Sequence, residues 1–92
     1  MPSRVQIEPG SSRWLRKRSD IDIMASILNE AHRGARKTNI MYRCNLSHRQ
    51  LQAYLKLLLG MELLASQSDL FKTTLKGRKF VDAYRTLKAL MT

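Results

Sequence analysis

The sequence contains a single cysteine, Cys44, and no long run of apolar residues. One thiol cannot form an internal disulfide, which excludes the class of small secreted domains held together by disulfides and fits a reducing compartment. No apolar run approaches the roughly 18 residues needed to cross a bilayer. Residues 1–12 also lack the apolar stretch of a signal peptide. We therefore expect a soluble, cytoplasmic protein with no membrane partner.

Residues that carry metal or catalytic chemistry are also few. His32, His48 and Cys44 lack the paired spacing of a zinc site, and no glycine-rich loop is present that would cradle a phosphate. No pair of carboxylates in a plausible cleft and no Ser-His-acid set is suggested. The sequence thus predicts no metal site, no cofactor and no enzymatic activity, and Cys44 is expected to pack as a small apolar side chain.

Acidic residues are scarce relative to basic ones. The chain has 17 Lys and Arg but only 7 Asp and Glu, which gives a formal net charge of +10. Such a field attracts polyanions, and nucleic acid is the commonest polyanion in cells. Residues 1–18 hold five of the cations and one of the acids, so the excess of positive charge extends well beyond this segment.

Residues 1–18 are predicted to form a flexible basic arm, because they contain both prolines and a Gly-Ser-Ser step but no sustained apolar period. The arm either clamps phosphates or serves as a solubilising leader. Trp14, flanked by Arg13 and Arg16, either docks on nucleic acid or packs on the surface of its own domain.

A first helix is expected over about 20–32. Ser19 is a favourable N-cap, and Asp22 can return the hydrogen bond much as Glu does in a capping box. Gly34 is expected to close this helix. The apolar residues that follow the i, i+4 spacing of one helical face, and so predict its buried side, are Ile23, Met24, Ile27, Leu28 and Ala31.

Two further helices are expected in the middle of the chain. The second is short, with Thr38 as its cap, and Asn45 makes the turn after it because Asn tolerates the left-handed conformation. The third starts at a capping box formed by Ser47 and Gln50, and Gly60 supplies its C-terminal turn.

After Gly60 the pattern changes from helical to alternating. The runs "MELLASQ" and "LFKTTL" flank Ser68 and Asp69 and read as a β-hairpin. Residues 75–92 then return to helical spacing with a coiled-coil seam, which we predict to be a dimer interface because it would otherwise expose a stripe of apolar groups. The alternative is burial of the seam against the first helix of the same chain. The predicted interface residues are Phe80, Ala83, Tyr84, Leu87, Leu90 and Met91.

Three helices followed by a hairpin and a further helix predict a mainly α fold, the winged helix-turn-helix. The runs "KTNIMYRCNLSHRQLQAYLKLLLGMELL" and "TTLKGRKFVDAY" resemble a family of small archaeal winged-helix proteins, which includes dimeric chromatin-type DNA-binding proteins and related transcriptional regulators. The resemblance implies that residues 37–42 form the first helix of the helix-turn-helix and residues 47–59 the recognition helix. It also implies dimerisation through the C-terminal helices, often as an antiparallel coiled coil.

Two features depart from that family's pattern. The final helix is short, and Asp69 stands at the wing tip, where a loop facing phosphates would prefer a cation. We expect the wing to contribute little to binding. The predicted organisation is an arm (1–18), a winged helix-turn-helix domain (19–74) and a dimerisation helix (75–92).

Helix spacing divides the third helix into two faces. Leu51, Tyr54, Leu55 and Leu58 belong to the core, whereas the opposite face carries no acid and offers groups that suit base edges and phosphates. The alternative is that this polar face is only solvated, as we expect for the cations of the last helix, Arg78, Lys79, Arg85 and Lys88. The complete set of predicted DNA-binding residues is Arg36, Lys37, Thr38, Tyr42, Arg43, Ser47, His48, Arg49, Gln52, Ala53, Lys56 and Lys72.

The function predicted from these features is binding of double-stranded DNA by a homodimer, as a transcriptional regulator or as a chromatin-associated protein of the nucleoid. The alternative function is that of a protein-protein interaction module that does not bind DNA, because winged-helix folds serve both purposes.

Overall fold

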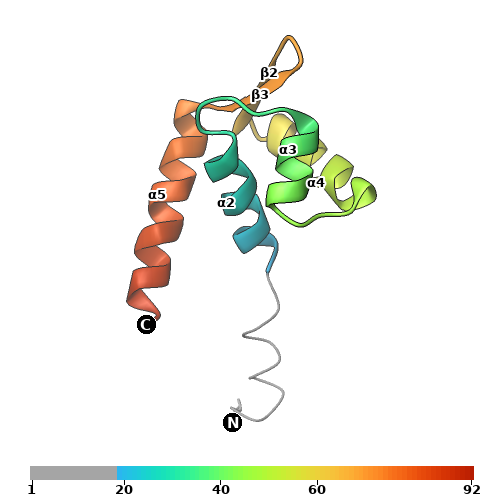
Figure 1. Cartoon of the computed structure of the whole chain (residues 1–92). Coiled ribbons are helices and arrows are strands. Elements are labelled where there is room, and N and C mark those ends of the chain that lie inside the picture. The colour runs from blue at the N-terminus through green and yellow to red at the C-terminus, as the bar shows by residue number, and fades with distance from the viewer. Residues whose placement is uncertain (1–18) are drawn as a thin grey trace.

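The computed structural model describes residues 19–92, and the predicted arm lies outside the described residues. Within this range the order of elements is helix, helix, helix, hairpin, helix, as predicted, and the fold is a mainly α winged helix-turn-helix. Figure 1 shows α2 and α5 side by side, with α3 and α4 on the other side of α2 and the hairpin at one end. The elements are α2 (Asp20–Glu30), α3 (Lys37–Arg43), α4 (His48–Gly60), β2 (Leu64–Gln67), β3 (Leu70–Thr73) and α5 (Leu75–Leu90). None of these described helices is both long and apolar enough to span a membrane.

Helix α2 begins as predicted. The side chain of Ser19 accepts a hydrogen bond from the backbone N–H of Asp22, whose carboxylate accepts one in return from the backbone N–H of Ser19. The helix ends at Glu30, slightly earlier than expected. Gly34 has a φ of 97°, so a left-handed residue does close the turn that follows.

Helix α3 begins at a different residue from the one predicted. Its N-cap is Arg36, whose side chain makes no capping hydrogen bond, and Thr38 lies inside the helix. The reason is tertiary: Ala35 forms an antiparallel bridge with Phe71 of β3, which holds the backbone extended up to Arg36. The turn after α3 follows the prediction, because Asn45 has a φ of 56°.

Helix α4 has the predicted start but a different end. Ser47 and Gln50 form the capping box, with each side chain accepting a hydrogen bond from the backbone of the other. Gly60 is still helical, however, and the left-handed residue is Glu62, with a φ of 62°. The hydroxyl of Thr74 donates to the carbonyl oxygen of Glu62 at 2.7 Å, and so holds this turn from a distant part of the chain.

The hairpin pairs β2 with β3 antiparallel, so that Leu64 faces Thr73 and Gln67 faces Leu70. The strands are shorter than the two apolar runs, since residues 61–63 form a turn and Thr74 caps α5. The bridge from Ala35 to Phe71 adds a short third segment beside β3. It attaches β3 to the segment that precedes α3.

The core lies where α2, α3, α4 and the first half of α5 meet. Ile27, Leu28, Ile40, Leu51 and Leu58 have no exposed surface. The core cluster around them includes the inner faces predicted for the first and third helices, with Tyr54 partly buried against it. Cys44 is buried in the same cluster, as expected for a small apolar side chain.

Helix α5 reaches this core through a close approach at Gly77. A Cβ atom on Gly77 would lie 2.2 Å from the carbonyl oxygen of Leu63 and 2.6 Å from the Cγ2 atom of Thr73. Glycine is therefore required where α5 crosses the end of the hairpin. One turn further along, Val81 completes the core cluster.

Candidate nucleic-acid interface

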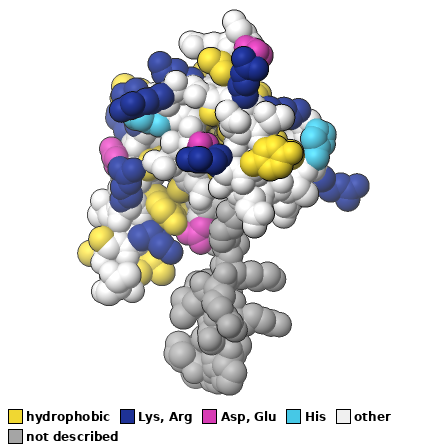
Figure 2. All heavy atoms as spheres, in the orientation of Figure 1, with side chains coloured by type: hydrophobic (Ala, Val, Ile, Leu, Met, Phe, Trp, Pro, Cys, Tyr) yellow, Lys and Arg dark blue, Asp and Glu magenta, His cyan; other side chains and the backbone are white. Residues whose placement is uncertain are grey.

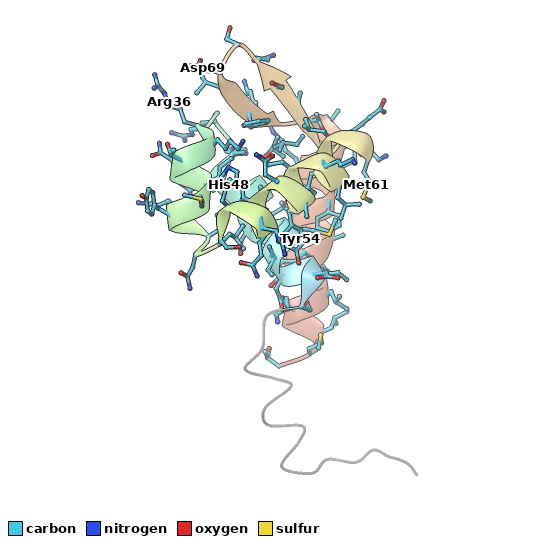
Figure 3. The ribbon with its side chains drawn as sticks, turned by 90° about the vertical axis from the view of Figure 1, so that its right-hand side faces the viewer. Arg36, His48, Tyr54, Met61 and Asp69 are labelled. Atoms are coloured by element: carbon cyan, nitrogen blue, oxygen red, sulfur yellow. The ribbon has the colours of Figure 1, made fainter. Side chains whose placement is uncertain are left out.

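The outer face of α4 is open to solvent. Arg49, Gln52, Ala53 and Lys56 are all exposed, whereas Leu51, Leu55 and Leu58 on the opposite face are buried. The division of α4 into two faces is therefore confirmed. Figure 3 shows the helix along its length, with His48 in its first turn and Met61 just past its last.

Helix α4 is held in place at its middle and at its C-terminal end. The hydroxyl of Tyr54, in the middle of the helix, donates a hydrogen bond of 2.6 Å to the carboxylate of Asp20 in α2. At the C-terminal end, the amine of Lys76 in α5 donates to the carbonyl oxygen of Met61 at 2.9 Å. A helix supported by packing and by polar contacts outside its exposed face can present that face without rearrangement.

The first turn of α4 brings together Ser47, His48 and Gln52. The Nε2 atom of His48 lies 3.5 Å from the Nε2 atom of Gln52, and both side chains are exposed. The Ser47 oxygen is engaged in the capping box, but its hydroxyl hydrogen remains available to donate to an anion. The free backbone N–H groups and the helix dipole favour negative charge at this point.

Helix α3 contributes residues of different accessibility. Arg36 and Thr38 are exposed and Lys37 is half-buried. Tyr42 is 78% exposed, which is unusual for an aromatic residue within a small domain. Arg43 is also exposed, but its guanidinium lies 3.4 Å from the carboxylate of Glu30, so part of its charge is already balanced.

The wing places an acid and a base near the start of α3. Lys72 is exposed on β3, opposite Ala65. Figure 3 shows Arg36 and Asp69 at the same end of the molecule, beside the hairpin.

The predicted dimer seam is divided by the fold. Phe80 is half-buried and packs against the core of its own chain, and the hydroxyl of Tyr84 donates a hydrogen bond to the carboxylate of Asp22. The alternative of burial against the first helix therefore applies to these two residues. Ala83 is exposed, as are Leu87, Leu90 and Met91 at 47%, 79% and 59%. In Figure 2 hydrophobic side chains gather at the lower left, over the C-terminal half of α5.

Asp22 has a second role that sequence reasoning missed. Besides capping α2 it accepts the hydrogen bond from Tyr84 and lies 3.6 Å from the amine of Lys88. The Tyr84 hydrogen bond and those from Ser19 lower the pKa of Asp22 from 3.8 to about 2. The same contact raises the pKa of Tyr84. The sequence did not predict this contact, because Asp22 fits the local capping motif and that motif gives no sign of a distant partner.

One exposed cation near the predicted interface was also missed. Arg33 lies in the turn between α2 and the bridge at Ala35, close in sequence to Arg36 and Lys37. The only sequence signal for it is the basic run "RGARK".

Comparisons with known proteins agree with this architecture. A protein-family model described as winged helix-turn-helix matches residues 17–92. The fold is also similar to the crystal structure of Sso10a-2, a DNA-binding protein from Sulfolobus solfataricus, with a TM-score of 0.73 over 80% of this chain and 82% of that one. The two sequences are 20% identical, so the similarity is one of fold. A search of curated proteins found no match.

Proposed function

Because this chain belongs to the winged helix-turn-helix family, we propose that it binds double-stranded DNA with the outer face of α4 in the major groove. The observation that carries the proposal is the exposed face of α4, which bears Arg49, Gln52 and Lys56 and no acid. A solvated helix face usually mixes charges of both signs. The fold shared with the DNA-binding protein Sso10a-2 supports the same function.

Each side chain on this face has a chemical role in the proposal. Arg49 suits bidentate pairing with guanine and Gln52 with adenine, while the small Ala53 allows close approach or contacts a thymine methyl group. Lys56 suits a phosphate, as do Ser47 and His48 at the helix N-terminus.

Further phosphate contacts are proposed beside α4. Arg36, Lys37 and Thr38 lie at the start of α3, and Lys72 lies on the wing. Tyr42 offers an exposed hydroxyl at the end of α3, and Arg43 contributes less because of its ion pair with Glu30. The wing contributes little in this arrangement, because Asp69 at its tip repels phosphate.

We propose that two chains pair through the exposed part of α5. Ala83, Leu87, Leu90 and Met91 form the apolar surface available to a second copy. A two-fold dimer would place two recognition helices about 34 Å apart, which is one turn of DNA, and so favour a pseudo-palindromic site. Such a dimer would act as a transcriptional regulator or as a chromatin-associated protein of the nucleoid.

Titration of duplex DNA across a salt series tests the central proposal. Each neutralised phosphate contributes about −0.9 to the slope of log K against log salt, so six contacts would give about −5. A slope near zero, or no binding at all, would contradict the proposal and favour the protein-interaction alternative. Genome-wide mapping of bound DNA separates the two biological roles, since a regulator gives few sharp peaks and a chromatin protein gives broad coverage.

A further inference from the structure

A groove runs between α2 and α5, away from the proposed DNA-binding face. It contains a cavity of about 190 Å³ and an adjoining one of about 210 Å³. Their lining comes from α2, the turn after it, β3 and α5. In Figure 1, α2 and α5 lie side by side, with α3 and α4 beyond α2.

The groove is open because small side chains line it between two points at which α5 is held in place. At one end Tyr84 is hydrogen-bonded to Asp22, and at the other α5 packs closely on the hairpin at Gly77. Between these points the α2 side is lined by Ala25 and Ser26, which are too short to fill the space. The hollow is therefore a consequence of the packing of the two helices.

The polar lining of the first cavity includes two arginines and one acid. Arg78 and Arg85 are seven residues apart on α5, which is about 10 Å along the helix, and both line the first cavity. His32, in the turn after α2, also lines this cavity, and Asp82 is the acid in the lining. Neither of the two ion pairs described within residues 19–92 involves Arg78, Arg85 or Asp82. Arg78, Arg85 and Asp82 together give the lining a net charge of +1.

The floor of the cavity is apolar. It consists of Val81, which is 9% exposed, while Leu28 borders the cavity without exposed surface of its own. Between the two cavities, Arg85 donates a weak hydrogen bond of 3.3 Å to the side chain of Asn29. Since this contact is exposed, the guanidinium can turn toward a ligand at little cost.

We propose that this groove binds a small organic anion. Its phosphate or carboxylate lies between Arg78 and Arg85, and its apolar part contacts the exposed part of Val81. Guanidinium groups pair with both kinds of anion through two parallel hydrogen bonds. A cavity of about 190 Å³ has room for a small molecule. A DNA backbone would not fill a concave site with an apolar floor.

Titration of the full chain with phenyl phosphate and with inorganic phosphate, followed by NMR, tests this proposal. We expect saturable shifts at Asn29, Val81 and Arg85 with both probes. Phenyl phosphate is expected to bind more tightly, because only its ring covers the floor of the cavity. Shifts that do not saturate, or that occur chiefly on α4, would contradict the site.

Matched substitutions on α5 separate the groove from general charge effects. Arg78→Gln is expected to weaken binding of phenyl phosphate about tenfold through loss of a charge-assisted hydrogen bond. Lys79→Gln removes the same charge from the neighbouring exposed residue outside the lining, and is expected to change little. Asp82→Asn removes the repelling acid and should tighten binding. Equal effects of Arg78→Gln and Lys79→Gln would overturn the proposal.

The same variants distinguish a small anion from DNA. We expect Arg78→Gln and Lys79→Gln to bind duplex DNA alike, since the groove lies apart from the outer face of α4. A selective loss of DNA affinity in Arg78→Gln would make the groove a DNA contact and overturn the small-anion proposal. The phenyl phosphate result does not depend on whether α4 reads DNA, so the two proposals can fail separately.

Discussion

The hydroxyl of Tyr84 donates a hydrogen bond to the carboxylate of Asp22, and this contact joins the C-terminal half of α5 to the first turn of α2. Asp22 is at the same time the capping residue of α2 and the partner of Lys88. One carboxylate therefore sets the start of one helix and the position of another. It also fixes which part of the α5 seam remains available to a second chain.

The first prediction concerns the pH dependence of this contact. Because the pKa of Asp22 is lowered from 3.8 to about 2, its stabilisation is present above pH 3.8 and is lost as the pH falls toward about 2. Asp22→Asn is expected to lower the free energy of unfolding by about 1–2 kcal/mol at neutral pH. The difference from the wild type should shrink over that acidic range. Urea denaturation at a series of pH values measures it.

Asp69→Asn provides the matched control for this experiment, because Asp69 lies exposed at the wing tip. It is expected to leave stability at neutral pH unchanged. A wild-type chain and an Asp22→Asn variant with the same stability at neutral pH would show that the negative charge of Asp22 does not stabilise the fold.

The second prediction concerns the proposed reading face of α4. Arg49→Ala should reduce discrimination among DNA sequences, with a loss of about 1–3 kcal/mol for the preferred site. Lys56→Ala should weaken binding to all sequences alike and reduce the salt slope by about 1. Fluorescence anisotropy with specific and random duplexes measures both effects.

Lys79→Ala is the control for those two variants, because Lys79 is exposed on α5 rather than on α4. It should retain DNA affinity. If DNA binding persists while Arg49→Ala and Lys56→Ala have no effect on it, another surface must read the DNA.

The third prediction concerns the proposed dimer. Leu87→Glu places a charge in the exposed apolar stripe of α5 and is expected to produce monomers without loss of helix content. Thr86→Glu, on a neighbouring exposed position of the same helix, is expected to leave the dimer intact. Light scattering at micromolar concentration measures the oligomeric state, and far-UV circular dichroism measures the helix content. A wild-type chain that is monomeric under these conditions would rule out the interface.

The fourth prediction compares two glycines, one packed closely against other atoms and one with open space around it. Gly77→Ala forces a Cβ atom against the Leu63 carbonyl and should destabilise the fold by about 1–3 kcal/mol or more. Gly60→Ala has no atom within 4 Å of its new Cβ and lies at the end of a helix. Because alanine favours helix, its effect should be neutral or stabilising by up to about 1 kcal/mol. Thermal denaturation measures the stability of both variants. Equal changes in stability would contradict the close approach at Gly77.

Much of the fold follows from local signals in the sequence. The capping box of Ser47 and Gln50 and the leucine spacing of α4 predicted both the start of that helix and its buried face. The Ser19 cap of α2 and the left-handed turn at Asn45 were predicted in the same way. These signals suffice because a cap or an amphipathic period acts within one or two turns of chain.

Contacts between distant segments account for the features that were predicted wrongly. The bridge from Ala35 to Phe71 moved the N-cap of α3 from Thr38 to Arg36, and the Thr74 hydrogen bond fixed the left-handed turn at Glu62 instead of Gly60. Local patterns carry no information on partners that lie 12 or more residues away.

By itself, the sequence determined the order of elements, the two faces of α4 and the excess of positive charge, because each of these depends on residue type and spacing along the chain. The tertiary structure alone decided that Phe80 and Tyr84 turn inward while Leu87 and Leu90 stay exposed, and that a charged groove opens between α2 and α5. Both outcomes depend on how closely two helices approach, and that distance is set by Gly77 at one end and by the Asp22 carboxylate at the other.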